Sequence, residues 1–191
     1  MKSKILILII SGLFGIITSC NDDEPITNNF KIGQKHEGGI IFYIDDSGQH
    51  GLIAAPFDQA YREADWGCHG VDFLGASDTA IGSGLQNTLD IIDALNQSDD
   101  CVPNNPAALL CVNLSIDGFS DWYLPSMEEL KLMHEHREII GGFGLDFYWS
   151  SSEFNNIWTR VRFFSEIESE FDGDWNAGKR NPHSVRAVRS F

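Results

Sequence analysis

Two apolar runs near the start of the chain are separated by a polar segment, which is the pattern of a β-hairpin. Residues 38–44 (GGIIFYI) and 51–55 (GLIAA) are rich in residues that favour strands. The segment between them, 45–50 (DDSGQH), is rich in turn-forming residues. The pattern therefore predicts two antiparallel strands, followed by a glycine-rich loop over 57–85.

The middle of the chain has apolar residues at helical spacing. Leucines and an isoleucine repeat at intervals of three over 89–95, after a cap at Asn87 or Thr88. A second short helix is predicted over 106–114, where a proline opens the segment and the apolar residues share one face. Both segments predict helices that bury one side.

A capping box marks the start of a third predicted helix. The Ser126 hydroxyl is expected to accept a hydrogen bond from the backbone N–H of Glu129, whose carboxylate reaches back to the N–H of Ser126. After a glycine-rich break at 141–144, strands are predicted over 147–152, 157–164 and 184–191. The order predicts one α+β domain, in which the terminal strands pair in a small antiparallel sheet flanked by two or three helices.

The first 20 residues have the pattern of a bacterial lipoprotein signal. Two lysines precede an apolar run over 5–17, which is shorter than the roughly 20 residues that a membrane-spanning helix needs. Residues 17–20 (ITSC) resemble a lipobox, in which the signal is cut before Cys20 and the thiol is acylated. The alternative is an ordinary secretory signal that ends by chance in a cysteine.

An acidic segment follows the predicted lipidation site. Residues 21–24 (NDDE) resemble the surface-export signal of lipoproteins in one group of Gram-negative bacteria, although a solvated tether would have the same composition. We therefore expect an outer-membrane lipoprotein of the cell envelope, attached to the membrane by its N-terminal lipid and displayed at the surface. The predicted division is a signal peptide over 1–19, an acidic tether over 20–32 and a folded domain over 33–191.

The charge balance narrows the choice of partners. The 191 residues include 28 Asp and Glu but only 13 Lys and Arg, so the net charge is −15. Such a chain has no basic surface with which to neutralise phosphate, so we expect no nucleic-acid partner. The same acidity argues against electrostatic docking on anionic lipid.

Three short sequence motifs resemble those of a known protein family. Residues 121–126 (DWYLPS), 148–151 (YWSS) and 185–189 (VRAVR) occur in this order, and together they resemble the Lcl C-terminal domain family, named for a collagen-like bacterial adhesin. The resemblance covers about residues 36–191 and implies a C-type-lectin-like fold whose loops carry the binding surface. The named adhesin is thought to bind glycosaminoglycans, but repulsion from an acidic domain argues against a sulfated polyanion here.

The residues of these motifs also have a structural interpretation. Trp122 precedes a capped helix and is expected in the core, and an arginine in an apolar terminal strand usually pairs with a carboxylate. The candidate partners of the two strand arginines are Asp121 and Glu129. We therefore expect fold maintenance to be the role of Asp121, Trp122, Ser126, Glu129, Trp149, Arg186 and Arg189.

Cysteine usage predicts one disulfide. With Cys20 lipidated, three cysteines remain, and Cys111 lies on the apolar face of a predicted helix. Cys68 and Cys101 lie in predicted loops, so we expect these two to pair after export. The alternative is a catalytic cysteine, as in the formylglycine-generating enzymes with their lectin-like fold, but those use a cysteine pair in a C-terminal cleft and this chain has no cysteine after Cys111.

Metal binding has weak support. His134 and His136 are two positions apart on a predicted helix, so their side chains point some 200° apart and are interpreted as surface histidines. Asp172, Asp174 and Asn176 have the spacing of the first EF-hand calcium ligands, but the sixth and twelfth positions lack Gly and Glu. A polar hairpin turn is the preferred interpretation, so no cofactor is expected, with calcium as a weak alternative.

The function favoured by these patterns is a lipid-anchored binding module for a glycan or a protein partner. Trp66 and Trp175 lie in predicted loops and are the candidate binding residues, because exposed indole rings stack on sugars. The alternative is a structural envelope lipoprotein. An enzyme that acts on envelope material is less favoured, because no catalytic constellation is found in the sequence.

Overall fold

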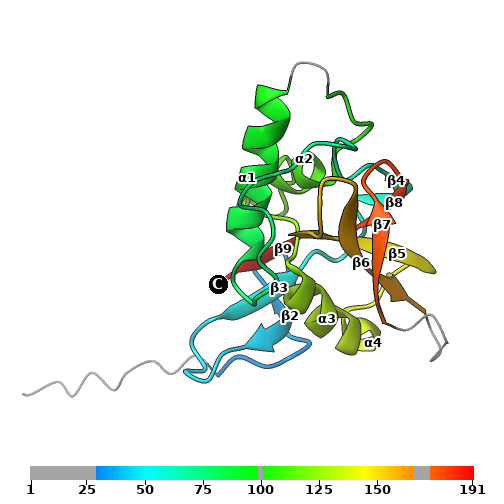
Figure 1. The fold of residues 1–191 in the computed structure, drawn as a ribbon. Coiled ribbons are helices and arrows are strands. Elements are labelled where there is room, and N and C mark those ends of the chain that lie inside the picture. The colour runs from blue at the N-terminus through cyan, green and yellow to red at the C-terminus, as the bar shows by residue number, and fades with distance from the viewer. Residues whose placement is uncertain (1–28, 99–100, 166–172) are drawn as a thin grey trace, which may run out of the picture.

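The structure is a computed structural model that describes residues 29–98, 101–165 and 173–191. Cys20 and the predicted signal and tether up to residue 28 lie outside the described residues. Within the described part, strands come first, four helices occupy the middle and strands return at the end (Figure 1). The predicted α+β class is therefore confirmed.

The first sheet joins the two ends of the described chain. Its strands are β1 (Lys35–His36), β2 (Gly39–Ile44), β3 (Gly51–Ala54) and β9 (Val188–Ser190), in the order β1-β2-β3-β9 with every pair antiparallel. The predicted hairpin is thus β2 and β3. Because β9 pairs with β3, the predicted pairing of terminal strands is also confirmed.

A second sheet, which the sequence did not predict, carries five strands. They are β4 (Ala60–Ala64), β5 (Asp146–Glu153), β6 (Trp158–Phe164), β7 (Asp174–Gly178) and β8 (His183–Val185), in the order β4-β8-β5-β6-β7. The β5–β8 pair is parallel and the others are antiparallel. β4 falls inside the predicted loop, and its irregular register with a positive φ at Arg62 hides the alternation that would have marked a strand.

The single terminal strand predicted over 184–191 is wrong. The chain instead leaves the second sheet after β8 and enters the first sheet as β9. Arg186 lies where the chain crosses from one sheet to the other. Its side chain is fully buried and donates hydrogen bonds to the Asp58 carboxylate and to the carbonyl of Ala55. Residues 184–189 are all buried through this crossing, so the strand pattern on its two sides does not mark the change of sheet.

In the described part of the chain four helices cover the sheets, whereas two or three were expected. They are α1 (Gly84–Gln97), α2 (Ala107–Val112), α3 (Met127–Glu135) and α4 (Arg137–Ile140). α1 begins earlier than predicted, with Ser83 at its N-cap position. Asn87 and Thr88 are therefore not caps but buried helix residues, and the Thr88 hydroxyl donates to the carbonyl of Gly84 at 2.7 Å.

The capping box of α3 is confirmed. The Ser126 hydroxyl accepts from the backbone N–H of Glu129 at 3.3 Å, and the Glu129 carboxylate accepts from the N–H of Ser126 at 2.8 Å. Glu129 also accepts from the N–H of Gly82, so it ties the loop before α1 to the start of α3. Burial raises the pKa of Glu129, against the backbone donors that lower it.

The core extends between the sheets. α3 contacts β2 of the first sheet and both β5 and β6 of the second (Figure 1). Trp66, Trp122 and Trp149 are the largest buried side chains and belong to one apolar cluster. Phe30, in the predicted tether, packs its ring 4.7 Å from that of Phe191, so the packed body includes residues before the predicted boundary at 33.

The predicted disulfide is present. Cys68 and Cys101 are bonded, and Cys111 is a buried free thiol, as expected. The bond links the loop after β4 to the segment after α1. Among the described residues, the helices are too short or too polar to cross a membrane.

Candidate functional site

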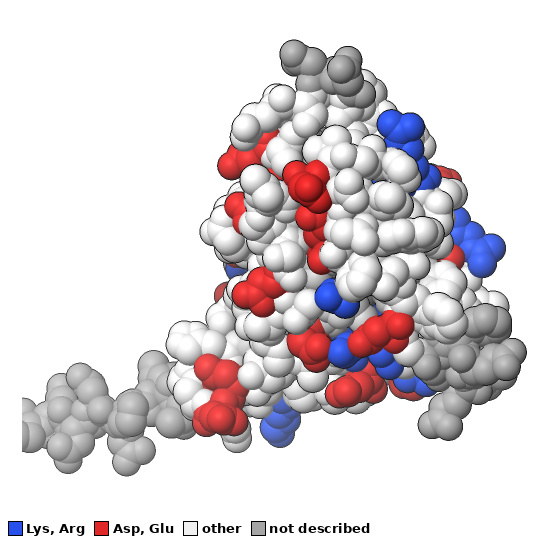
Figure 2. Space-filling view, in the orientation of Figure 1, with Lys and Arg blue, Asp and Glu red and all other residues white. Residues whose placement is uncertain are grey.

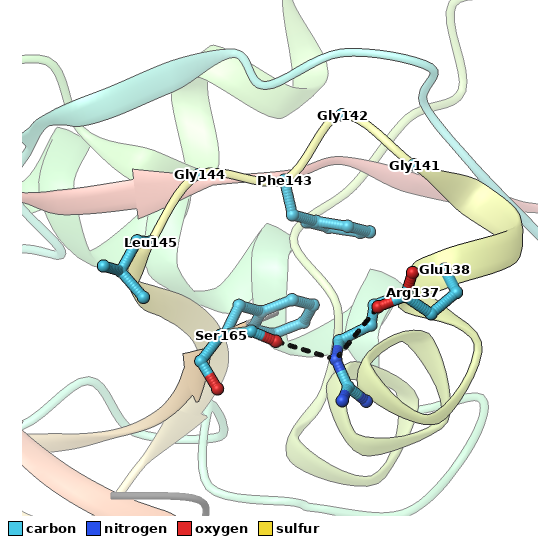
Figure 3. A pocket seen from close by; sticks show the side chains of 9 residues that line it. Arg137, Glu138, Gly141, Gly142, Phe143, Gly144, Leu145 and Ser165 are labelled. Carbon is cyan, nitrogen blue, oxygen red and sulfur yellow. Dashed lines mark hydrogen bonds and ion pairs between the residues drawn. The ribbon is translucent and has the colours of Figure 1, made fainter. Parts of the chain in front are cut away.

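A pocket opens between α4 and the adjoining ends of β5 and β6. Its volume is about 520 Å³, a size typical of small-molecule sites. Figure 3 shows Phe143 extending from the chain that links α4 to β5, with Arg137 and Ser165 on the other side. The lining residues, which together define the glycine-loop pocket, are Arg137, Glu138, Gly141, Gly142, Phe143, Gly144, Leu145, Phe164 and Ser165.

Glycines shape the upper wall of this pocket. Gly141 and Gly142 have φ angles of +73° and +70°, which L side chains rarely adopt. A Cβ at Gly144 would lie 2.1 Å from a ring carbon of Tyr61, so a larger residue there would require the exposed Tyr61 ring to move. These requirements turn the chain sharply after α4 and place the single aromatic residue of the loop, Phe143, in the pocket wall.

The loop is fixed from behind by Arg186. Its guanidinium is fully buried and donates to the carbonyls of Gly141 at 3.2 Å and Gly142 at 2.6 Å. The same guanidinium lies 4.1 Å from the centre of the Phe143 ring. Asp58 accepts from Arg186 at 2.7 Å and balances its charge. One buried arginine therefore holds both the backbone and the aromatic side chain of the wall.

A second chain of hydrogen bonds reaches the same loop. The Tyr148 hydroxyl donates to Asp58 at 2.7 Å and accepts from the N–H of Gly144 at 2.7 Å. Burial raises the pKa of Tyr148, and burial also raises the pKa of Asp58 despite the nearby Arg186. A buried network with these groups satisfied keeps the pocket wall in one conformation.

The opposite wall supplies polar groups. Arg137 donates from Nε to the carbonyl of Ser165 at 2.9 Å and from Nη1 to the carbonyl of His134 at 3.1 Å, so its guanidinium is oriented. Glu138 lies 4.0 Å from Arg137 and leaves 76% of its side chain exposed. The pocket thus combines aromatic rings, a guanidinium and an accessible carboxylate.

Comparison with known proteins gives no family for this chain. A scan against protein-family models found no match, and a search of curated proteins found none. Because fold alone does not define activity, the function is argued from the geometry of the site.

Most of the motif residues assigned to fold maintenance form ion pairs or hydrogen bonds within the fold. Arg189 pairs with Asp121 at 2.7 Å and also contacts Glu37, so one of the two predicted partners is correct. Arg186 pairs with Asp58 instead of Asp121 or Glu129, because the chain crosses between sheets at this point. Trp122 and Trp149 are buried, and their indole N–H groups donate to the carbonyls of Phe119 at 3.0 Å and Ala64 at 2.7 Å.

The assignment of Trp66 as an exposed binding residue is wrong. Its side chain is fully buried, and its indole N–H donates to the carbonyl of Ser150 at 2.7 Å. The Phe73 ring packs edge-on against it with a centroid distance of 5.1 Å. The loop that contains Trp66 is covered by neighbouring chain, including the segment that the disulfide anchors at Cys68, and composition alone does not reveal such coverage.

Trp175 is exposed, as predicted, but it lies in β7 instead of a loop. It packs against Phe147 with a centroid distance of 6.5 Å and does not line the glycine-loop pocket. The interpretation of His134 as a surface residue is wrong, because its ring is buried and packs 5.0 Å from that of Phe164. His136 caps α3 and is partly exposed.

The calcium candidates do not come together in the described chain. Asp172 lies outside the described residues, and Asp174 binds Lys131 at 2.8 Å and Arg162 at 3.0 Å. Asn176 is exposed in β7. Across the described ranges no three His, Cys, Asp or Glu side chains gather in a way that could hold a metal ion.

The pocket residues were not predicted from the sequence. The run Gly141-Gly142-Phe143-Gly144 was interpreted only as a break before the strands, although three glycines around one aromatic residue are a usable signal. They indicate a backbone that must turn in ways other residues cannot and that presents a single ring. The contacts of Arg186 with the loop could not have been predicted from the sequence, because its partners Asp58 and Gly142 are 128 and 44 positions away.

Proposed function

We propose that the protein is a lipid-anchored binding module of the cell envelope that recognises a saccharide at the glycine-loop pocket. The observation that carries this proposal is the preformed pocket itself, whose wall is fixed by the buried Arg186–Asp58 pair. Preorganisation favours binding, because no ordering entropy of the loop has to be overcome when a ligand enters.

The lining groups suit a sugar. A sugar ring has an apolar C–H face that packs on an aromatic side chain, and Phe143 and Phe164 supply aromatic rings to the lining. Its hydroxyl groups both donate and accept, which matches the exposed carboxylate of Glu138 and the guanidinium of Arg137. Leu145 is 57% exposed at the rim and adds apolar area.

The surrounding charge argues for a neutral or weakly charged sugar. Figure 2 shows acidic side chains distributed over the face of the molecule in view, with basic ones interleaved among them near its base. The net charge of −15 repels a densely sulfated polymer over the whole surface. The glycosaminoglycan ligand of the Lcl adhesin is therefore not transferred to this chain.

The predicted lipidation signal and the fold implied by the resemblance support the same proposal. The lipobox at 17–20 would place the protein on the outer membrane, where glycans are accessible. The C-type-lectin-like fold implied by the resemblance is supported by the pairing of β9 with β3, which brings the two ends of the domain together. Structural envelope lipoprotein is the alternative, and the experiment below separates it from a binding module.

A glycan array with the full chain in detergent micelles tests the proposal. We expect binding to a restricted set of saccharides, and loss of that binding in a Glu138→Ala/Leu145→Ala double variant, because both side chains are exposed in the lining. The matched control is Leu89→Ala/Asp93→Ala, which removes similarly exposed groups from α1. Absence of binding by the wild type, or equal loss in both variants, would contradict the proposal and leave the structural role.

A further inference from the structure

A second cluster of exposed aromatic and polar side chains lies at the other end of β6 from the pocket. Register pairs Trp158 with Gly178 and Arg160 with Asn176, while the intervening pair Thr159 and Ala177 is buried. Trp158, Arg160 and Asn176 therefore share the outer face of β6 and the edge strand β7.

Phe154 completes this cluster. It lies in the turn between β5 and β6, where its N–H donates to the carbonyl of Trp158 at 3.0 Å. The Arg160 guanidinium lies 5.1 Å from the centre of the Phe154 ring. Phe154 is 50% exposed and Trp158 is 42% exposed, so two aromatic side chains next to one guanidinium remain accessible to solvent.

Arg160 differs from the other enclosed basic side chains of the described chain. In those ranges, every other lysine or arginine that is buried or half-buried has a carboxylate within ion-pair distance: Lys131, Arg137, Arg162, Lys179, Arg186 and Arg189. Arg160 is half-buried and has no carboxylate of the described residues within ion-pair distance. The Nε atoms of Arg160 and Arg162 are both enclosed without a hydrogen-bond acceptor among the described residues, so the missing ion pair is what distinguishes Arg160.

Arg162 shows which interaction Arg160 lacks. Arg162 lies two residues further along the same strand, and its Nη1 pairs with Asp174 of β7 at 3.0 Å. The residue of β7 opposite Arg160 is Asn176, whose amide cannot neutralise a guanidinium. Enclosing a charge without a partner is unfavourable, so an anionic ligand would supply the partner that the chain omits.

We propose that Phe154, Trp158, Arg160 and Asn176 form a binding site for a carboxylate-bearing sugar, such as a uronic acid residue. The guanidinium fork matches a carboxylate in a bidentate arrangement. The aromatic side chains pack on the C–H faces of the sugar, and the Asn176 amide binds a hydroxyl group. This site goes beyond the proposed function, because its residues and its ligand differ from those of the glycine-loop pocket.

The acidity of the whole protein is compatible with this site. Charges on an exposed surface are screened beyond about 8 Å at physiological ionic strength. A single carboxylate that reaches Arg160 meets mainly this guanidinium, whereas a densely sulfated polymer meets the charge of the whole face. The site therefore selects for isolated carboxylates on a sugar chain with accessible apolar ring faces.

Calorimetric titration of the full chain in detergent micelles tests the site with two matched probes. The first is tetragalacturonate, and the second is its methyl ester, which has the same sugars without the carboxylate charges. We expect the acid to bind at least tenfold more tightly than the ester. Equal affinity for both probes, or binding of neither, would overturn the proposal.

Variants locate the interaction. Arg160→Gln is expected to lose at least tenfold in affinity for the acid and to abolish its preference over the ester, while Arg160→Lys keeps part of the affinity because the charge remains without the fork. The control is Arg180→Gln, which removes an exposed arginine after β7. Arg160→Gln should melt at or above the wild-type temperature, since it removes an unpaired enclosed charge. Wild-type affinity in Arg160→Gln would show that the carboxylate binds elsewhere.

Discussion

At the residue scale, the polar contacts of buried side chains range from a near neighbour at a helix start to a partner 128 positions away. The capping box formed by Ser126 and Glu129 spans three positions, and its geometry follows from the helix start alone. The partner of Arg186 is 128 positions away, so nothing local identifies it. Trp66 illustrates the same limit, because whether a loop residue is buried depends on what the rest of the chain places over it.

Glu129→Gln should change the pH dependence of stability. The folded-state pKa of Glu129 is raised above its ordinary value of 4.5 because the carboxyl is buried. The protonated form is therefore favoured by folding, so the resulting stability is fully present below about pH 4.5 and is lost as pH rises through the folded pKa. The stability advantage of the wild type over Glu129→Gln should accordingly shrink from pH 4 to pH 8.

Denaturant unfolding at several pH values measures this difference. Glu129→Gln also leaves one of two backbone donors, Ser126 or Gly82, without its acceptor, so we expect an overall loss of about 1–3 kcal/mol at pH 4. Glu135→Gln is the control, since Glu135 is exposed on the same helix. A wild-type advantage that grows with pH would contradict the burial of a costly charge.

Trp66 and Trp175 should respond differently to truncation. Trp66→Ala removes a fully buried indole and its hydrogen bond to Ser150, so the free energy of unfolding should fall by about 3–5 kcal/mol. Trp175→Ala removes a side chain that is 44% exposed, and we expect a loss of about 1 kcal/mol or less. Chemical denaturation of both variants provides the comparison, and equal losses would show that the burial of Trp66 is misassigned.

At the element scale, elements with a regular hydrophobic period could be predicted from the sequence, whereas irregular strands could not. The hairpin of β2 and β3 and the short helix α2 follow from apolar runs with clear boundaries. β4 has five residues, of which the middle three are exposed, and its register is irregular, so no period of two is visible. Its place in the second sheet is determined by pairing with β8, which is 119 or more positions away and was itself hidden in the predicted terminal strand.

The disulfide should stabilise the segment between β4 and α2. The bond joins residues 33 positions apart, and closing a loop of this length contributes roughly 3–4 kcal/mol in the chain-entropy description. We expect Cys68→Ser/Cys101→Ser to unfold at correspondingly lower denaturant concentration. Full retention of wild-type stability by this variant would mean that the loop is held by packing alone.

Cys111 provides an independent measurement on the same element. The thiol is buried, and burial raises its pKa, so both access and reactivity are low in the folded protein. Alkylation followed by peptide mass spectrometry should modify Cys111 only after unfolding, in the wild type and in the disulfide variant. Rapid modification of folded wild type would contradict its position on the inner face of α2.

At the scale of the whole molecule, the first sheet brings the two ends of the described chain together. β9 lies beside β3, so the folded end of the chain returns to the N-terminal sheet, while the predicted anchor at Cys20 precedes that sheet (Figure 1). α+β class and paired termini were predictable because strands flank the helices in sequence. The division into two sheets was not, because residues 184–189 are all buried across the change of sheet at Arg186, and their burial depends on distant segments.

Lipidation is tested on the whole protein in cells. Cys20→Ser should remain uncleaved by the lipoprotein signal peptidase and should not incorporate a clickable fatty acid, because the acylated thiol is absent. Ser19→Ala keeps the cysteine and a small preceding residue, so this control should label like the wild type. Equal labelling of Cys20→Ser and wild type would contradict the lipobox interpretation.

Binding of a saccharide at the glycine-loop pocket can be followed residue by residue in an NMR titration of the backbone amide signals. The ligand is the saccharide with the strongest array signal, added to the full chain in detergent micelles. We predict saturable shifts concentrated on the amides of Gly141, Gly142, Gly144 and Leu145, while the amides of α1 stay unchanged. Saturable shifts elsewhere in the protein, with these four amides unmoved, would contradict binding at this pocket.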